Sequence, residues 1–483
     1  MLMKYYIKTF GCQMNHSDSE RISGFLESNG YEPINETPLS AEALAKADLV
    51  IFNTCGVRQM AEDRVYGQIH NLANRGSRIV GREAQNTKPI IILTGCLANR
   101  PDVQKRLKGK VDLFFSINDF KKFENFVIEN SLKIENLKLK IAQKTNPLTN
   151  ENIAYLSINP KHTNTYRAFV PIMTGCNNFC SYCVVPFARG REVSRPAEEI
   201  ISEVKNLIKS GYKEIILLGQ NVNSYKDEDK RDPIPLKGSD PYSTVNFSQL
   251  LKKIDALPGK FWIHFVSNHP KDVTQEMIET VAQCKKVCEV FHLPIQSGND
   301  EVIKKMNRKY TAEQYLKLVK KIKSAYKKYK PENLYSITSD IIVGFPGETR
   351  KQFLDSAEIM KAVGYDMVFF GQFSPRPQTA AWNMKDNVSK AEKVRREKYL
   401  NEILKKTVHS NNKKYVGQVL DVLIEKEGSK SPIGLLEPKQ HTYFGRTRTG
   451  KNVKISASQK NLIGQIIKVK ITKANIWNLE GKL

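Results

Sequence analysis

Short apolar runs alternate with segments of helical periodicity along the first quarter of the chain. The apolar runs at 5–9, 48–52, 90–93 and 111–115 predict strands, and the segments at 17–30 and 101–107 predict helices between them. Apolar strands separated by helices are typical of a parallel sheet that is covered on both faces. We therefore predict an N-terminal parallel α/β domain over residues 1–130, followed by a polar linker rich in Lys and Asn over residues 131–160.

The same alternation restarts near residue 169 and continues for longer. Apolar runs at 169–173, 215–218, 261–266, 290–293, 336–343 and 367–373 predict six strands with helices between them. The best-marked helix is predicted to begin at Ser194, with Pro196 in its first turn and an apolar face over 200–208. Six successive βα units predict a central partial (βα)6 barrel over residues 161–395, with its active site at the carboxyl ends of the strands.

The C-terminal part of the chain shows a third pattern. A helical stretch at 389–409 precedes short alternating strands at 417–424, 453–455 and 464–471, which are broken by Gly and Asn. This pattern predicts a small β-barrel over residues 412–483. The fold class expected for the whole chain is therefore α/β with a C-terminal β-barrel.

The charge balance of the chain indicates a polyanionic binding partner. The 483 residues include 76 Lys and Arg against 50 Asp and Glu, a net charge of +26. Such an excess favours a polyanion, and nucleic acid first, because each phosphate contact releases a condensed counterion. A general solubility effect of scattered lysines is the alternative. No run approaches the about 18 apolar residues of a membrane span, and residues 1–10 lack the apolar core of a secretory signal, so we expect a cytoplasmic protein without a membrane partner.

Three of the eight cysteines form a CxxxCxxC run of Cys176, Cys180 and Cys183, directly after the first predicted barrel strand. Clustered cysteines in a reducing compartment indicate a metal site or catalysis rather than disulfides. Three thiolates on one loop can each bind one iron of a 4Fe-4S cluster, which leaves the fourth iron open to a substrate or cofactor. A structural zinc site is the alternative, but zinc requires a fourth ligand, and no His or further Cys lies beside this run.

A second set of three consists of Cys12, Cys55 and Cys96, each of which ends an apolar run. If these strands are parallel, their thiols emerge at one edge of the sheet and again offer three thiolates. Taken singly, each has an alternative as a buried core residue, but the repeated context favours a site. We interpret Cys284 and Cys288, which lie in a predicted helix, as core residues.

These motifs together resemble a known family. The CxxxCxxC run, with an aromatic residue before its last cysteine and set in a βα barrel, is similar to the radical S-adenosylmethionine (SAM) enzymes. The segments 11–15, 53–58 and 95–98 resemble the N-terminal signature of the methylthiotransferases, and the C-terminal barrel resembles a TRAM domain. The segments 183–192, 218–223, 292–298 and 344–349 extend the resemblance over nearly the whole chain, while the loops at 71–88 and 225–242 are longer than expected.

The resemblance implies two 4Fe-4S clusters and SAM as cofactors. It assigns the cluster that binds SAM to Cys176, Cys180 and Cys183, and an auxiliary cluster that carries the sulfur to Cys12, Cys55 and Cys96. The implied reaction is radical methylthiolation of C2 of N6-isopentenyladenosine at position 37, in the anticodon stem-loop of tRNA. A low-potential electron donor such as flavodoxin or ferredoxin is implied, whereas the sulfur donor is not identified.

Residue type and position predict further contacts with SAM and with RNA. We expect SAM contacts from residues at or near predicted strand ends, with ordinary turn capping as the alternative: Gln220, Asn221, Ser297 and Asp340. We expect RNA contacts from aromatic and basic residues of the C-terminal barrel, with a solvated hairpin as the alternative: Tyr443, Arg446, Arg448 and Lys451. Arg189 and Arg191 are expected to touch SAM or phosphate, or to pair with Glu192.

Three other functions compete with this one. Enzymes of the same family that act on N6-threonylcarbamoyladenosine in tRNA, or on an aspartate of a ribosomal protein, share both cysteine sets. A non-enzymatic iron–sulfur or zinc RNA-binding protein is the alternative from another class. The segment 183–192 favours the isopentenyladenosine branch by resemblance, and the charge of +26 favours RNA over protein.

Overall fold

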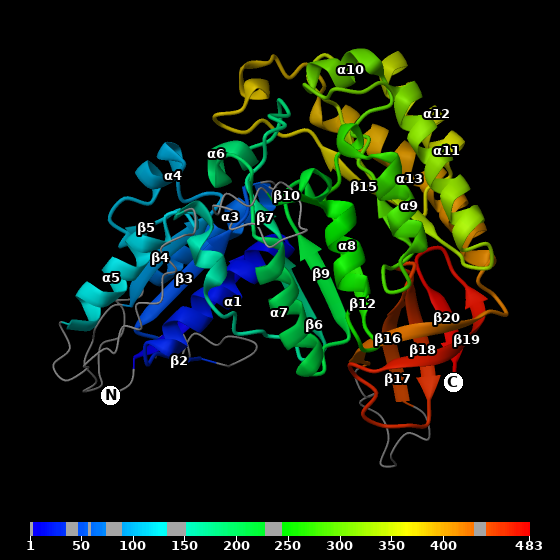
Figure 1. The fold of residues 1–483 in the computed structure, drawn as a ribbon. Helices are drawn as coiled ribbons and strands as arrows, with labels where there is room; N and C mark the ends of the chain where they lie inside the picture. Colours follow the sequence, from blue (N-terminus) through cyan, green and yellow to red (C-terminus); the bar gives the residue numbers. More distant parts are fainter. Residues whose placement is uncertain are drawn as a thin grey trace, which may run out of the picture.

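Figure 1 shows the computed structural model, in which three units follow one another along the chain. The structure describes residues 3–34, 47–56, 59–73, 89–132, 151–227, 244–428 and 441–483. Most of the predicted linker and most of the two lengthened loops lie outside the described residues. None of the helices in the described part is both long enough and apolar enough to cross a membrane.

The N-terminal unit is a parallel sheet, as predicted, with the four expected strands and a short fifth one, β2, that was not predicted. Its strand order is β2-β1-β3-β4-β5. One face packs on α1 and α5 through Ile51 and Ile92, while the other packs on α3 and α4 through Val50 and Ile91. The elements are β1 (Lys4–Phe10), α1 (Gln13–Ser28), β2 (Glu32–Pro33), β3 (Leu49–Thr54), α3 (Gln59–Ala73), β4 (Ile90–Gly95), α4 (Pro101–Arg106), β5 (Leu113–Phe114) and α5 (Phe120–Leu132).

The central unit is an open half-barrel of six parallel strands in chain order. Its strands form two three-stranded sheets, β6-β9-β12 and β13-β14-β15. A parallel bridge between Ile263 and Val287, just before β13, joins the two. The strands are β6 (Arg167–Pro171), β9 (Glu214–Leu218), β12 (Trp262–Phe265), β13 (Val290–His292), β14 (Ser336–Val343) and β15 (Met367–Gln372). The predicted six strands are confirmed.

Helices cover the outer face of this half-barrel (Figure 1). They are α7 (Ala197–Lys209), α8 (Phe247–Asp255), α9 (Gln275–Gln283), α11 (Ala312–Tyr329), α12 (Arg350–Val363) and α13 (Lys390–Lys413), with the short α6 (Val185–Arg189) and α10 (Asp300–Lys305) at the carboxyl ends of the strands. The predicted start of α7 at Ser194 is wrong, because Ser194 lies in β8 (Val193–Ser194), paired with β7 (Met173–Thr174), and Pro196 is the N-cap. Cys284 and Cys288 are buried core residues as interpreted, although α9 ends before them.

The inner face of the half-barrel is apolar on one side and polar on the other: Ile216 and Leu218 of β9 pack on Met14 of α1, whereas β13 and β14 present polar groups. Along β14, Ile337 and Ile341 are buried under the helices, whereas Thr338 and Asp340 are only half-buried on the opposite face. His292 of β13 lies on the same inner face, where its Nδ1 atom is 2.9 Å from Oγ1 of Thr338. The inner face of β13 and β14 thus carries hydrogen-bonding groups.

The C-terminal unit is a small closed β-barrel, as predicted. Its strands are β16 (Val419–Glu427), β17 (His441–Thr447), β18 (Asn452–Ala457), β20 (Leu479–Lys482) and β19 (Ile466–Ala474), in that order around the barrel. The strands β17 and β20 were not predicted. The barrel lies at the amino ends of the central strands, because Arg446 of β17 contacts Glu214, the first residue of β9 (Figure 1).

Candidate active site

The three N-terminal cysteines lie together at the carboxyl edge of the first sheet. Cys12 follows β1, Cys55 follows β3 and Cys96 follows β4, which are neighbouring parallel strands. The Cys55 thiol is within hydrogen-bonding reach of both Cys12 and Cys96. We call this set the N-terminal trio. Parallel strand order therefore brings together three residues that are about forty positions apart in sequence.

A network of amide side chains holds this edge in place. The Asn15 Oδ1 atom accepts hydrogen bonds from the Cys12 backbone N–H and thiol, both at 3.3 Å, while its Nδ2 group donates to Asn53 at 2.9 Å. Gly95 has a φ angle of +83°, and a Cβ there would lie 2.2 Å from the Thr54 carbonyl oxygen. Only glycine allows β4 to turn into Cys96 at this distance from β3.

The electrostatics of the N-terminal trio favour thiolates at Cys12 and Cys96. Hydrogen bonding from the Cys55 thiol lowers the pKa of Cys12 to about 5 and that of Cys96 to about 6, against the opposing effect of burial. The positive charge of Arg189 lowers both pKa values further. The pKa of Cys55 is raised, because this thiol lies between two anionic neighbours. Thiolates are the form that binds metals.

The second set, Cys176, Cys180 and Cys183, lies on the loop after β7, and we call it the barrel trio. Gly175 starts this loop with a φ angle of +78°, and a Cβ there would lie 2.0 Å from the Arg191 carbonyl oxygen. The Cys183 backbone N–H donates to the Cys180 carbonyl at 3.0 Å, which closes a tight turn. Burial raises the pKa of Cys176, and burial together with the neighbouring thiols raises that of Cys183 to about 12.

The two trios face each other across the interface between the first two units. Cys96 is one of the charged neighbours that raise the pKa of Cys183. A Cβ placed on Gly56 would lie 3.2 Å from Cβ of Cys96 and 3.3 Å from a methyl group of Val184. Gly56, directly after Cys55, is therefore in contact with both the N-terminal trio and the residue that follows Cys183.

Arg308 is a functional candidate that sequence reasoning missed. It is buried, and its Nη1 group lies 3.7 Å from Sγ of Cys180 and donates to the Tyr182 hydroxyl at 3.0 Å. Its Nη2 group donates to the Pro294 carbonyl at 2.9 Å, and its Nε group to Tyr310 at 2.5 Å. Arg308 therefore places a cation beside the barrel trio. The same side chain ties the segment after β13 to the loop that carries this trio. The basic segment 304–309 gave no pattern that separates Arg308 from its surface neighbours.

The structure corrects the expectation for Arg189. Arg189 does not pair with Glu192, because its Nη2 group donates to Asp18 of α1 at 2.5 Å and both side chains are buried. Asn118 donates to the Arg189 carbonyl at 2.5 Å, which also ties α6 to the N-terminal unit. Arg191, in contrast, is exposed and lies 4.3 Å from the Phe179 ring centroid.

The four residues predicted to contact SAM lie in different surroundings. Gln220 and Asn221 follow β9 at its carboxyl end, and the Oε1 and Oδ1 atoms of their side chains are buried with no hydrogen-bond partner in the described part of the chain. Ser297 is fully buried, and its hydroxyl accepts from the Asn299 backbone in a local turn. Asp340 lies inside β14, and its carboxylate faces His292 at 3.5 Å.

The four residues predicted to contact RNA are not on an open surface. Tyr443 is fully buried in the core of the small barrel. The other three make ion pairs with the central barrel: Arg446 with Glu214, Arg448 with Glu289, and Lys451 with Asp366. The basic side chains that were expected to meet RNA therefore face another unit of the chain.

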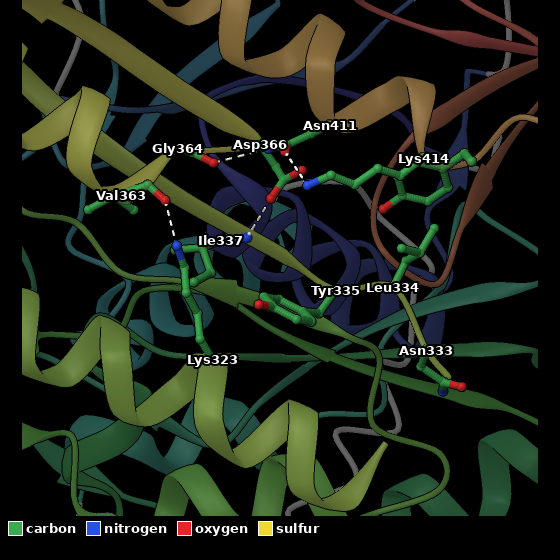
Figure 2. Close-up of a pocket in the computed structure, with 11 residues that line it drawn as sticks. Lys323, Asn333, Leu334, Tyr335, Ile337, Val363, Gly364, Asp366, Asn411 and Lys414 are labelled. Atoms are coloured by element: carbon green, nitrogen blue, oxygen red, sulfur yellow. Dashed lines mark hydrogen bonds between the residues drawn. The ribbon is translucent and has the colours of Figure 1, made fainter. Parts of the chain in front are cut away.

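A cavity of about 150 Å³ lies at the amino end of β14, opposite the strand ends that carry the trios (Figure 2). Its polar groups already have partners. Lys323 donates to the Val363 carbonyl at 2.8 Å, and Asp366 accepts from the Ile337 backbone at 3.0 Å. Asn411 donates to the Gly364 carbonyl at 3.0 Å. We assign this cavity no part in the site.

The residues present fit the cofactors that the resemblance implies. Each trio supplies three cysteine sulfur atoms, which suits a 4Fe-4S cluster in which each cysteine binds one iron. In the part of the chain that the structure describes, no three His, Cys, Asp or Glu side chains are arranged around a single metal-ion position. The unpartnered oxygens of Gln220 and Asn221, one strand away from the barrel trio, suit a ligand with amino or hydroxyl donors.

Comparison with known proteins agrees with this architecture. Residues 4–116 match the model described as uncharacterized protein family UPF0004, residues 170–360 match the radical SAM superfamily, and residues 413–483 match the TRAM domain. The fold and the barrel trio thus define a radical SAM protein. Among solved structures, the radical SAM methyltransferase TsrM from Kitasatospora setae is similar, with a TM-score of 0.49 and 12% identity over 79% of this chain and 77% of that chain.

Curated relatives match almost the whole chain. The tRNA-2-methylthio-N(6)-dimethylallyladenosine synthase of Clostridium botulinum is 40% identical over 99% of this chain and 96% of that protein. The enzyme of the same name from Thermoanaerobacter pseudethanolicus is 38% identical over 99% of this chain and 92% of that protein. The chain belongs to the family of tRNA-2-methylthio-N(6)-dimethylallyladenosine synthases.

Proposed function

We propose that this protein transfers a methylthio group to C2 of N6-isopentenyladenosine at position 37 of tRNA, giving 2-methylthio-N6-isopentenyladenosine. The observation that carries the proposal is the position of the N-terminal trio against the barrel trio, joined through Gly56, which adjoins both Cys96 and Val184. A reaction that joins sulfur to an unreactive carbon needs both centres within reach of one substrate atom. The name of the relatives, tRNA-2-methylthio-N(6)-dimethylallyladenosine synthase, supports this choice of substrate.

We assign one 4Fe-4S cluster to Cys176, Cys180 and Cys183, and a second one to Cys12, Cys55 and Cys96. When bound, the barrel cluster and SAM supply the one-electron chemistry that generates a carbon radical able to remove hydrogen from an aromatic C–H bond. The protein supplies placement. Arg308 fixes the loop of the barrel trio to β13 through Pro294, and Asn15 fixes the end of β1 at Cys12.

The inner face of the half-barrel, where β13 and β14 carry polar groups, receives the substrate in this proposal. Gln220 and Asn221 offer buried acceptors to the donor groups of SAM, and Asp340, held opposite His292, offers a carboxylate on the same concave face. The adenine has to leave its stack to reach this face, at a cost of a few kcal/mol that is smallest in a single-stranded loop. The net charge of +26 favours the approach of tRNA.

The remaining assignments follow from the same proposal. The functional units are residues 1–130 for the methylthiotransferase domain, 131–160 for the linker, 161–395 for the radical SAM domain and 412–483 for the TRAM domain. A low-potential donor such as flavodoxin or ferredoxin supplies electrons, and the cytoplasm is the proposed location because it holds the tRNA.

Nucleoside mass spectrometry of tRNA from cells that lack the protein tests the proposal. We expect loss of the methylthio group with isopentenyladenosine retained. Unchanged tRNA nucleosides would reject the function, and loss of methylthiolation at threonylcarbamoyladenosine would transfer the protein to the other tRNA branch. A ribosomal-protein substrate predicts an unmodified aspartate in the same cells, and an RNA-binding protein without activity predicts no change in either.

A further inference from the structure

Two buried arginines of the central unit flank the N-terminal trio, and each meets a carboxylate of the N-terminal unit. Arg189 donates to Asp18 at 2.5 Å, and Nη1 of Arg376 lies 3.5 Å from Oε2 of Glu62. Asp18 lies on the helix that follows Cys12, and Glu62 lies on the helix that follows Cys55. Both ion pairs therefore cross the interface beside the thiols.

Arg189 has a hydrogen-bonding group left over. Its side chain is 4% exposed, and only its Nη2 group reaches Asp18. The Nη1 group is buried and has no partner among the residues that the structure describes. Leaving an N–H group of a cation buried without an acceptor is costly, so such a group indicates an acceptor that binds there. The charge of Arg189 acts on both Cys12 and Cys96.

We propose that Arg189 is a positioning residue for the auxiliary cluster, whose anionic sulfur atoms accept a hydrogen bond from its Nη1 group, while Asp18 partly balances its charge. The inference rests on the proposed function only in requiring a cluster on the N-terminal trio. A guanidinium remains charged at every accessible pH. A permanent cation beside the cluster stabilises its reduced, more negative state and so raises the reduction potential.

The test is a redox titration, followed by electron paramagnetic resonance, of the full-length chain reconstituted with iron and sulfide. The three barrel cysteines are replaced by alanine in every sample, so that only the auxiliary cluster contributes. We expect a more negative midpoint potential for Arg189→Met and a more positive one for Asp18→Asn. Arg189→Lys keeps the charge but not the planar fork, and its potential should lie between those of the parent and Arg189→Met.

A matched control is available on α1, the helix that carries Asp18. Arg21 of α1 is 1% exposed and pairs with Glu203 of α7 at 3.0 Å, so it crosses the same interface. Its charged neighbours are Glu203 and Arg195 rather than thiols. Arg21→Met should weaken the interface without moving the potential. An equal shift in Arg21→Met would overturn the proposal, because the effect would then come from domain docking.

The outcomes separate this proposal from the proposed function. An auxiliary cluster whose potential is the same in the parent and in Arg189→Met overturns the role of Arg189 alone. A parent chain that binds no iron on the N-terminal trio overturns both. If Arg189→Met does not fold, the other two variants decide the question. The midpoint potential should become more positive in Asp18→Asn and more negative in Arg189→Lys. A change of the same sign in both variants contradicts the proposal.

Discussion

Arg446 of β17 places its Nη2 group 3.0 Å from Oε1 of Glu214, the first residue of β9. The Glu214 carboxylate is fully buried and also contacts Arg167 and His264. One acid of the central unit thus meets three basic groups, one of them from the TRAM barrel. The TRAM barrel is therefore docked by buried charge at the end of the half-barrel that is opposite the two trios.

We expect Glu214→Gln to destabilise the protein by about 3 kcal/mol, because removal of one partner from a buried ion pair leaves uncompensated charge. Here Arg167 and Arg446 would keep Glu425 as a shared carboxylate partner but lose the buried one. Denaturant unfolding followed by circular dichroism measures the loss. Glu313→Gln is the matched control: its exposed carboxylate pairs only with Lys317 of the same helix, and we expect no measurable change. Equal stabilities of the two variants would contradict the role of Glu214.

The same carboxylate predicts a pH dependence of stability. Burial alone would raise the pKa of Glu214, but hydrogen bonding to His264 and the nearby arginines outweigh it and lower the pKa well below its ordinary 4.5. A depressed pKa in the folded state gives stabilisation that is complete above the unfolded pKa and is lost as pH falls. Unfolding free energy should therefore decline below about pH 4.5, and less steeply in Glu214→Gln than in the parent. Parallel pH profiles would contradict this assignment.

The sequence predicted the N-terminal trio but not the arginines around it, for a physical reason. Strand ends are encoded locally, so Cys12, Cys55 and Cys96 converge once the strands are parallel. The contact of Arg189 with Asp18 joins positions 171 apart and depends on how two units dock, which no local pattern reports. The same limit explains Arg446, because its contact with Glu214 joins positions 232 apart and depends on how the TRAM barrel docks.

The two trios predict separable losses. We expect Cys180→Ala to abolish both SAM cleavage and tRNA modification, whereas Cys55→Ala retains SAM cleavage and blocks sulfur insertion. Two 4Fe-4S clusters contain about eight irons per chain, and each variant should retain about four. Iron analysis after anaerobic purification, together with chromatography of the SAM products, measures both effects. Removal of iron with a chelator should abolish both activities in the parent. A Cys55→Ala variant that thiolates tRNA normally would show that the role assigned to the N-terminal trio is wrong.

We expect substitution of Arg308 to impair the barrel trio and to leave the N-terminal trio intact. Groups that hold a metal ligand in place typically account for about 10- to 100-fold in metal affinity or activity, and Arg308 is the cation beside Cys180. We expect Arg308→Met to reduce the rate of SAM cleavage about tenfold or more, with iron retained on the N-terminal trio. Arg308→Lys should recover part of the rate, because it keeps the charge while losing the contacts to Tyr182 and Pro294. Equal iron loss from both trios would contradict this local role.

The ion pairs that tie Arg446, Arg448 and Lys451 to the central unit move the expected RNA contact to the outer face of the TRAM barrel. Lys470 of β19 lies directly opposite Lys482 of β20, and both are exposed. Adjacent like charges repel each other, and a phosphate bound between them would relieve that repulsion. We expect the double variant Lys470→Ala/Lys482→Ala to weaken tRNA binding and to reduce the slope of log affinity against log salt by about 1 to 2. Fluorescence anisotropy of an anticodon stem-loop at several salt concentrations measures both. The control Lys320→Ala/Lys321→Ala removes the same charge from α11 on the outside of the central unit; if it lowers the slope equally, the effect is one of net charge and this face is not the contact.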